Sequence, residues 1–279
     1  MILSRRGRAI RRTVMTGGLG IFLVWTLVPF LWIIDTSLKP TAELYQGATA
    51  LPRSPTLANY AALFTDSDFL TYFKNSLVVA VSTTVIAMAI GVLAAYAMTR
   101  LSFKGKGLLG NVTIVTYLVP PALLFIPLFQ VAYEFHLTDM AVGLIPVYLI
   151  FSVPFCTWLA ISYFSTIPFE LEEAAFVDGA NRLQALWRVL LPMTLPALAV
   201  TALYAFSQAW NEFLFALILI SSDSEKTVPL GLVEFIIGDV YQWGPLMAGA
   251  VLASLPPILI YVLAQRWIVS GLAAGAVKG

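Results

Sequence analysis

The sequence has few charged residues for its length. Asp, Glu, Lys and Arg make up 11% of the 279 residues, hydrophobic residues make up 59%, and the mean hydropathy is +0.87. An ordinary soluble domain carries about 25% charged residues. A water-soluble fold of this composition would expose an unusually large apolar surface. The composition therefore indicates an integral membrane protein.

Cysteine and histidine are almost absent, which excludes several kinds of site. The one cysteine, Cys156, cannot form a disulfide within the chain, and its apolar neighbours favour a packing role. The one histidine, His136, has no cysteine nearby with which to hold a metal. A net charge of +1 gives no field that would attract nucleic acid. We expect no catalytic residue, metal or cofactor in this chain, and no enzymatic activity of its own.

Six stretches without charge are long enough to cross a bilayer, which takes about 20 apolar residues in a helix. We expect an all-α polytopic fold whose membrane domain covers residues 13–270, between a basic N-terminus at 1–12 and a tail at 271–279. Prolines interrupt several stretches, but neighbouring helices can satisfy the freed carbonyls inside a membrane. The expected spans are 13–34, 76–99, 108–133, 141–163, 194–220 and 245–267, of which the fifth continues past Glu212 and the sixth reaches just past Arg266.

The distribution of Lys and Arg predicts the orientation. With the N-terminus inside, twelve of the sixteen Lys and Arg residues fall in cytoplasmic segments and four fall outside. Cytoplasmic loops of membrane proteins carry such an excess of positive charge. Six spans then place both termini in the cytoplasm.

The cytoplasmic loop at 167–192 has the pattern of a helix–turn–helix. Pro168 suits a first helical turn, and Gly179 suits a helix stop. Acids at Glu170, Glu172 and Glu173 favour a helix N-terminus. A second, amphipathic helix is indicated by the spacing of Leu183, Leu186, Trp187 and Leu190. The pattern leaves two interpretations open: a helix pair that ties two spans together, or a docking surface with a flat face of small residues.

The residues of this loop resemble the EAA motif of ABC importer permeases. That motif is Glu-Ala-Ala, three residues, Gly, nine residues and Ile-x-Leu-Pro; here it is Glu173-Ala174-Ala175, Gly179 and Val189-x-Leu191-Pro192, with Val189 in place of Ile. In that family the loop is a coupling helix that docks on an ATP-binding subunit. The resemblance implies an ABC importer type I permease fold, with ATPase-coupling residues at Glu172, Glu173, Ala174, Ala175, Asp178, Gly179, Arg182 and Pro192.

Other segments are similar to the carbohydrate-uptake, maltose-type branch of the binding-protein-dependent transport inner-membrane components. They are Ser37-Leu38-Lys39-Pro40, Asn59-Tyr60, Asn75-Ser76-Leu77, Trp210-Asn211-Glu212 and Trp243-Gly244-Pro245. The resemblance implies that the tail Gly275, Ala276, Val277, Lys278 and Gly279 contacts the ATPase. It also implies a contact with the binding protein at Thr227, Val228, Pro229, Leu230 and Gly231.

The resemblance also implies the partners: a second homologous permease, two ATP-binding subunits and an extracellular or periplasmic sugar-binding protein, at a bacterial or archaeal cytoplasmic membrane. Import of an oligosaccharide, disaccharide or related polyol is the expected function. A phosphate loop would need a glycine five residues before Gly105-Lys106, where the chain has Arg100. We therefore expect ATP and Mg to be bound by the partner subunits.

The fifth span carries the polar residues that suit a translocation path. At helical spacing, the offsets of four, seven and eight residues put Tyr204, Gln208, Asn211 and Glu212 on one face, with Ser207 adjacent. An acid within a span is costly, about 2.5–3.5 kcal/mol on insertion scales, so it normally faces protein or water. Two interpretations remain open: the strip lines a path for a hydroxyl-rich solute, or Asn211 and Glu212 bond across a helix interface.

A secondary carrier or channel that is not driven by ATP is the alternative function. Such a protein needs its own coupling charges or pore, and Glu212 is the only acid within an expected span. Six spans are also few for a carrier. The sequence therefore favours the importer permease.

Overall fold

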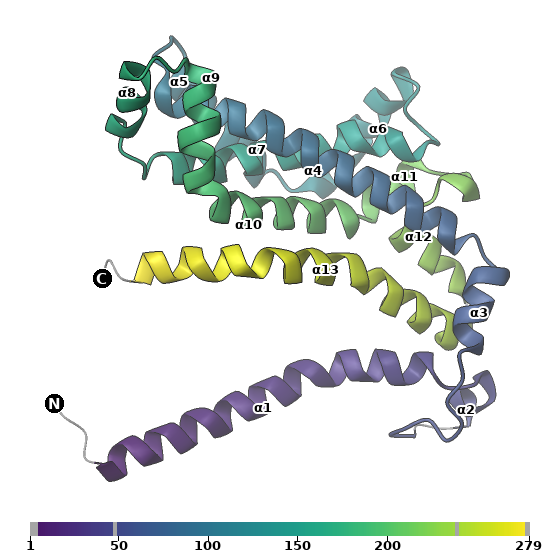
Figure 1. The fold of residues 1–279 in the computed structure, drawn as a ribbon. Helices are drawn as coiled ribbons and strands as arrows, with labels where there is room; N and C mark the ends of the chain where they lie inside the picture. The colour runs from purple at the N-terminus through teal and green to yellow at the C-terminus, as the bar shows by residue number, and fades with distance from the viewer. Residues whose placement is uncertain (1–4, 47–48, 238–239, 277–279) are drawn as a thin grey trace. The chain divides into compact units, whose positions relative to one another are not determined.

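The computed structural model describes residues 5–46, 49–237 and 240–276, and these residues are almost entirely helical (Figure 1). Within them the extended structure is one antiparallel pair, β1 (Ile236–Ile237) with β2 (Val240–Tyr241). The expected all-α class is confirmed. The chain divides into two compact units, one of residues 1–67 and 234–253 and one of residues 68–233 and 254–279.

The first unit contains α1 (Arg5–Ser37), α2 (Thr41–Tyr45), α3 (Ala58–Thr65), the two strands and the first part of α13 (Trp243–Ala276). Over residues 13–32 of α1 the apolar side chains are exposed, Trp25 to 80%. After α1 the chain is held by Asn59, which is buried and donates to the carbonyls of Ser37 and Lys39, both at 2.8 Å. Gly244 lies against the same Asn59, since a Cβ there would come within 2.2 Å of its Oδ1. Three of the segments shared with the maltose-type branch thus meet at one structural junction.

Glu43 organises the loop that follows. Its carboxylate accepts from the Arg53 N–H at 3.0 Å and from the Thr49 hydroxyl at 2.8 Å. Burial alone would raise the pKa of Glu43, but these hydrogen bonds and the nearby Lys39 together lower it. Lys39 is itself buried and pairs with Asp35. The charges of this loop are therefore used to fix its own conformation.

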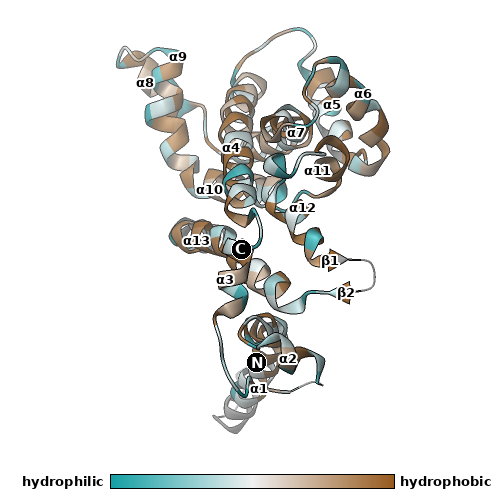
Figure 2. Ribbon diagram, turned by 90° about the vertical axis from the view of Figure 1, so that its right-hand side faces the viewer, coloured by the Kyte–Doolittle hydropathy of each residue, from teal (hydrophilic) through white to brown (hydrophobic). Residues whose placement is uncertain are grey.

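The second unit is built on three long helices: α4 (Phe69–Arg100), α7 (Leu144–Phe164) and α10 (Leu191–Trp210). Their ribbons are mostly hydrophobic in Figure 2. Buried side chains such as Val79, Leu144 and Phe206 form one core. At Gly91 the helices α4 and α7 come close, because a Cβ there would lie 2.8 Å from the Cβ of Cys156. A small residue permits such an approach in a membrane helix pair.

Shorter elements connect these helices. The first group is α5 (Lys106–Leu118), η1 (Pro121–Leu123), α6 (Phe125–Glu134) and η2 (Ala141–Gly143). Before α10 lie α8 (Glu170–Val177), α9 (Arg182–Ala185) and the π-helical segment η3 (Leu186–Leu190). After it lie α11 (Leu214–Leu219), η4 (Asp223–Glu225), α12 (Val228–Leu232) and η5 (Val233–Phe235).

Five helical stretches of the described residues are long and apolar enough to cross a membrane: Arg12–Ser37, Phe69–Arg100, Ala141–Phe164, Arg182–Leu219 and Trp243–Trp267. The span expected at 108–133 is not one helix. It is divided into α5 of 13 residues and α6 of 10 residues. The break falls at Pro120 and Pro121, which lack the N–H that a continuous helix needs. The count of six crossings stays a prediction.

The fifth expected span also differs from its expected limits. Helical backbone runs without a break from Arg182 through η3 into α10, so the expected second helix of the loop is the start of this span. The helix then ends at Trp210, and the separate helix α11 begins at Leu214. The expected single helix over 194–220 is therefore interrupted at residues 211–213.

Candidate functional sites

The EAA-like loop forms a helix–turn–helix. The helix α8 ends at Val177, and Gly179 follows in the left-handed conformation with φ 86°. The Gly179 N–H donates to the Phe176 carbonyl at 3.0 Å, and the Ala180 N–H donates to the Ala175 carbonyl at 2.9 Å. These two bonds are those of a Schellman motif, in which glycine is preferred. The expected helix stop at Gly179 is confirmed.

A capping box starts the next helix at once. The Asn181 side chain accepts from the Gln184 N–H at 2.9 Å, and the Gln184 side chain accepts from the Asn181 N–H at 2.8 Å. Such reciprocal bonds satisfy donors that a helix start leaves free. Because both ends of the turn are satisfied locally, α8 and α9 are held at a fixed angle.

Two neighbouring acids of α8 have opposite environments. Glu173 is exposed, whereas Glu172 is fully buried and forms an ion pair with Nε of Arg100 at the end of α4. Arg100 also donates from Nη2 to the Ile167 carbonyl at 2.9 Å. Glu172 is therefore an internal anchor and cannot touch a docking partner in this conformation. Arg100 was not among the residues expected from the sequence, where its only signal was a charge at the end of an apolar stretch.

The other coupling residues expected from the sequence lie at the surface. Ala175 is half-buried, while the rest are exposed, namely Glu173, Ala174, Asp178, Gly179, Arg182 and Pro192. Apolar side chains accompany them: Val177 is 88% exposed, Trp187 64% and Leu183 57%. Val177 was not among the residues expected from the sequence, because helical periodicity alone does not say which apolar residues stay uncovered. The loop thus presents a mixed surface of small, apolar and charged residues.

The polar residues of α10 interact mainly with one another. Gln208 donates to the Tyr204 hydroxyl at 3.0 Å, and the Tyr204 ring stacks on Phe155 with 4.0 Å between centroids. Asn211 donates to the Ser207 carbonyl at 2.8 Å. Tyr204, Gln208 and Asn211 are exposed and Ser207 is half-buried. These four residues do form a polar strip on the unit's surface.

Glu212 does not continue this strip, because α10 has ended before it. Its carboxylate accepts from the Tyr148 hydroxyl at 2.6 Å and from the backbone N–H groups of Phe215 at 2.9 Å and Ala216 at 3.2 Å. It thereby satisfies the free donors at the start of α11. The expectation of one helix face through Glu212 is wrong, and Glu212 bonds across the interface with α7.

The segment expected to meet a binding protein is mostly buried. The exposed fractions of Thr227, Val228 and Leu230 are 3%, 1% and 6%, and α12 packs on α4. Pro229 is half-buried, and a Cβ on Gly231 would lie 2.1 Å from the Tyr72 ring. In this conformation the preceding segment, 221–224, is exposed, as is Val233 after α12. Of the expected tail contact, Gly275 and Ala276 end α13, and Val277, Lys278 and Gly279 lie outside the described residues.

Asp139 fastens the exposed segment to the rest of the unit. Its Oδ1 accepts from the N–H groups of Ser221 at 2.9 Å and Ser222 at 2.6 Å, and its Oδ2 bonds the Ser222 hydroxyl at 2.6 Å. These hydrogen bonds lower the pKa of Asp139, and the bond from the Ser222 hydroxyl has the largest effect. Asp139 also has a positive φ of 57°, which Asp tolerates better than most residues.

Long apolar helices, a capped surface loop and a polar strip together define a membrane-embedded transport subunit. Residues 87–273 match the family described as the binding-protein-dependent transport system inner membrane component, and the chain belongs to this family. It is thus a permease component of the inner membrane. Nothing in the match supports an ATP-independent carrier or channel.

Relatives match over nearly their whole length. The inner membrane ABC transporter permease protein YcjP of Escherichia coli K12 is 39% identical over 99% of this chain and 100% of its own. The trehalose/maltose transport system permease protein MalG of Thermococcus litoralis is 35% identical over 98% and 99%. A chain in the crystal structure of a bacterial ABC transporter involved in the import of the acidic polysaccharide alginate aligns with a TM-score of 0.80 and 26% identity, covering 96% of this chain and 99% of that one. The two relatives are named as permease proteins, and the aligned chain of the ABC transporter has the same fold as this one.

Proposed function

We propose that this chain is one of two permease subunits of an ATP-driven sugar importer, with an oligosaccharide, a disaccharide or a related polyol as substrate. The observation that carries the proposal is the exposed, doubly capped turn between α8 and α9, in which Glu173, Ala174 and Gly179 keep the EAA spacing. The sugar class rests on relatives such as the trehalose/maltose permease MalG of Thermococcus litoralis.

Docking on an ATP-binding subunit would use the surface of this turn. Ala174 and the bare Gly179 let another backbone approach closely, and the apolar side chains Val177 and Trp187 are available to be covered. Glu173 supplies an exposed carboxylate for a basic partner. Because Glu172 is buried, it does not form part of the docking surface but holds α8, which carries that surface, in place. ATP and Mg would be bound by the partner subunits.

The polar strip of Tyr204, Ser207, Gln208 and Asn211 is the proposed lining of the path. Its hydroxyl and amide groups can exchange hydrogen bonds with a sugar, and the Tyr204 ring offers an apolar face. On the outer side, the exposed residues 221–224 are the proposed contact with a sugar-binding protein. Gly275 to Gly279 form the proposed second contact with the ATPase.

Co-purification tests the proposal most directly. We expect the tagged chain, expressed with its neighbouring subunits and extracted in mild detergent, to bring down an ATP-binding subunit. Glu173→Lys should abolish uptake by reversing the exposed charge. Gly179→Asp should do the same, because it puts a charged side chain on the turn and a non-glycine residue at φ 86°. Glu170→Gln, an exposed acid on the same helix, is the matched control and should transport normally. Failure to recover any ATPase with the wild-type chain would refute the proposal.

A further inference from the structure

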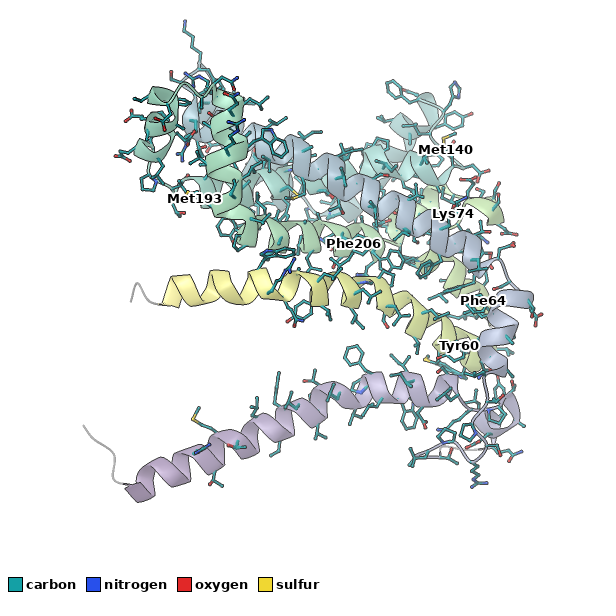
Figure 3. The ribbon with its side chains drawn as sticks, in the orientation of Figure 1. Tyr60, Phe64, Lys74, Met140, Met193 and Phe206 are labelled. Atoms are coloured by element: carbon teal, nitrogen blue, oxygen red, sulfur yellow. The ribbon has the colours of Figure 1, made fainter. Side chains whose placement is uncertain are left out.

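The helix α4 touches both functional loops of its unit, one at each end. It runs from Phe69 to Arg100 as 32 residues, roughly 48 Å at 1.5 Å per residue. That is enough to cross a bilayer core of about 30 Å and extend beyond it on both sides. Figure 3 shows Lys74 at the end of α4 near α12 and Met193 at the opposite end of the unit, where α10 begins. The helix is therefore placed to connect the two loops mechanically.

At its last residue α4 holds the coupling loop. Arg100 pairs with Glu172 of α8 and donates to the Ile167 carbonyl just before α8. The exposed fractions of the two side chains are 8% and 0%, so the pair is shielded from water. Separating a buried ion pair leaves an unpaired buried charge, which is strongly unfavourable. The loop therefore cannot shift far without carrying the end of α4 with it.

A second polar group of α4, the Tyr96 hydroxyl, lies near the same acid. The Tyr96 hydroxyl and the Glu172 Oε2 are both buried without a hydrogen-bond partner in the described part of the chain. Tyr96 lies four residues before Arg100, on the same face of α4. Tyr96 and Arg100 thus both interact with the acid of α8.

At its first turns α4 holds the other loop. Asn75 donates to the carbonyls of Ser224 at 2.9 Å and Lys226 at 3.0 Å. The Val228 N–H donates to the Ser76 hydroxyl at 2.7 Å in a buried position. Gly231 packs directly on the ring of Tyr72. The loop from η4 to α12 is thus bonded to successive turns of the same helix.

Between these ends α4 is unusually stiff for this protein. Of the five long apolar helices found among the described residues, it is the one whose sequence contains no proline. Proline removes a backbone hydrogen bond and bends or breaks a helix. A helix without a proline kink bends less, so a displacement of one end moves the other end by nearly the same amount.

Building on the proposed function, we infer that α4 is a rigid helix that couples the movement of the two loops. Arg100 and Glu172 are the positioning pair that attaches the coupling loop to it. Movement of the coupling loop, driven by the ATP-binding subunits, passes through this pair into α4. Asn75 and Ser76 pass it on to the loop that contains residues 221–232. The pair does not touch substrate, and its role is to keep the two loops moving together.

The test uses the assembled transporter in liposomes and compares uptake, ATP hydrolysis and thiol labelling. Asp223→Cys places an exposed thiol on the far loop, and Cys156 is buried. In this background we expect ATP with vanadate to change the rate of labelling by an impermeant reagent. Glu172→Gln should remove that change and lower sugar uptake about tenfold or more, a size typical of coupling between sites. ATP-binding subunits should still co-purify. Glu170→Gln and Lys104→Gln, both exposed, are the matched controls.

Variants at the far end keep the test decisive if Glu172→Gln does not assemble. Asn75 and Ser76 lie at the other end of α4 from the coupling loop. Asn75→Ala and Ser76→Ala should therefore leave co-purification of the ATP-binding subunits and basal ATP hydrolysis intact, while sugar uptake falls. If these variants, or Glu172→Gln, keep full uptake and the same ATP-dependent labelling as the Asp223→Cys background, the proposal that α4 couples the two loops is overturned. A wild-type chain that recovers no ATPase would instead refute the proposed function, so the two failures are distinguishable.

Discussion

Tyr148 donates a hydrogen bond of 2.6 Å to Glu212 and so joins the middle of the unit's core to the break between α10 and α11. Tyr148 is 3% exposed and Glu212 is half-buried. Two backbone N–H groups of α11 share the same carboxylate. The acid that looks like a path residue in the sequence is therefore a helix-start acceptor and an interhelical bond.

Glu212→Ala should destabilise the protein more than Tyr148→Phe does. The alanine leaves two N–H groups and one hydroxyl without their acceptor, at about 1–3 kcal/mol for each buried group that finds no other partner. The phenylalanine removes only one bond, and Glu212→Gln keeps an acceptor and should be intermediate. Thermal unfolding of the detergent-purified chain measures the order. Equal melting temperatures for all three variants would contradict it.

Labelling separates this structural role from a path role. A cysteine at position 212 should react slowly with small hydrophilic thiol reagents, whereas one at the exposed Gln208 should react faster. Rapid reaction at position 212 that depends on ATP would show that water reaches this position during transport.

Asp139 should make stability depend on pH in the acidic range. Hydrogen bonds lower its pKa in the folded protein, so the folded state binds a proton there less readily than the unfolded chain does. The stabilisation is therefore fully present above the unfolded pKa, about 3.9. It is lost as the pH falls through the lower, folded value.

Asp139→Asn should flatten this part of the stability profile. Asparagine tolerates the positive φ, so the backbone is kept while the charge is lost. Asp68→Asn serves as the control. Asp68 is exposed at the start of α4, and its side chain makes no capping hydrogen bond there. Melting temperatures between about pH 2 and pH 6, a range that extends well below the unfolded value, are the measurement. An unchanged profile in Asp139→Asn would contradict the assignment.

Gly91→Ala should separate α4 from α7. The added Cβ would lie 2.8 Å from the Cys156 Cβ and 3.0 Å from the Thr157 nitrogen, and backbone cannot move aside cheaply. Overpacking of this kind costs about 1–3 kcal/mol. Gly110→Ala is the matched control, because its Cβ would meet only the flexible end of Met98 at 3.4 Å. The thermal stability of both variants decides the point, and equal stability would argue against a tight crossing.

What could be read from the sequence was local. The charge-free stretches predicted membrane helices, and five of them appear as long apolar helices. The glycine at 179 predicted the end of α8, because only a few neighbouring residues determine a left-handed turn. The EAA spacing predicted the family, which the match over residues 87–273 confirms. The sequence also contains Pro120 and Pro121. It does not show whether neighbouring helices satisfy the freed carbonyls and keep one continuous helix, or whether the helix ends there.

Only the tertiary structure decided which polar groups meet. Glu172 and Glu173 are adjacent in sequence and chemically identical, yet one is buried against Arg100 and the other is exposed. That difference depends on where α4 ends, 72 residues earlier in the chain. Likewise, Val228 is buried because Ser76 and the other side chains of α4 cover α12. Hydrophobic periodicity and capping patterns act over a few residues, whereas burial and ion pairing depend on packing between distant segments, and no local pattern encodes that packing.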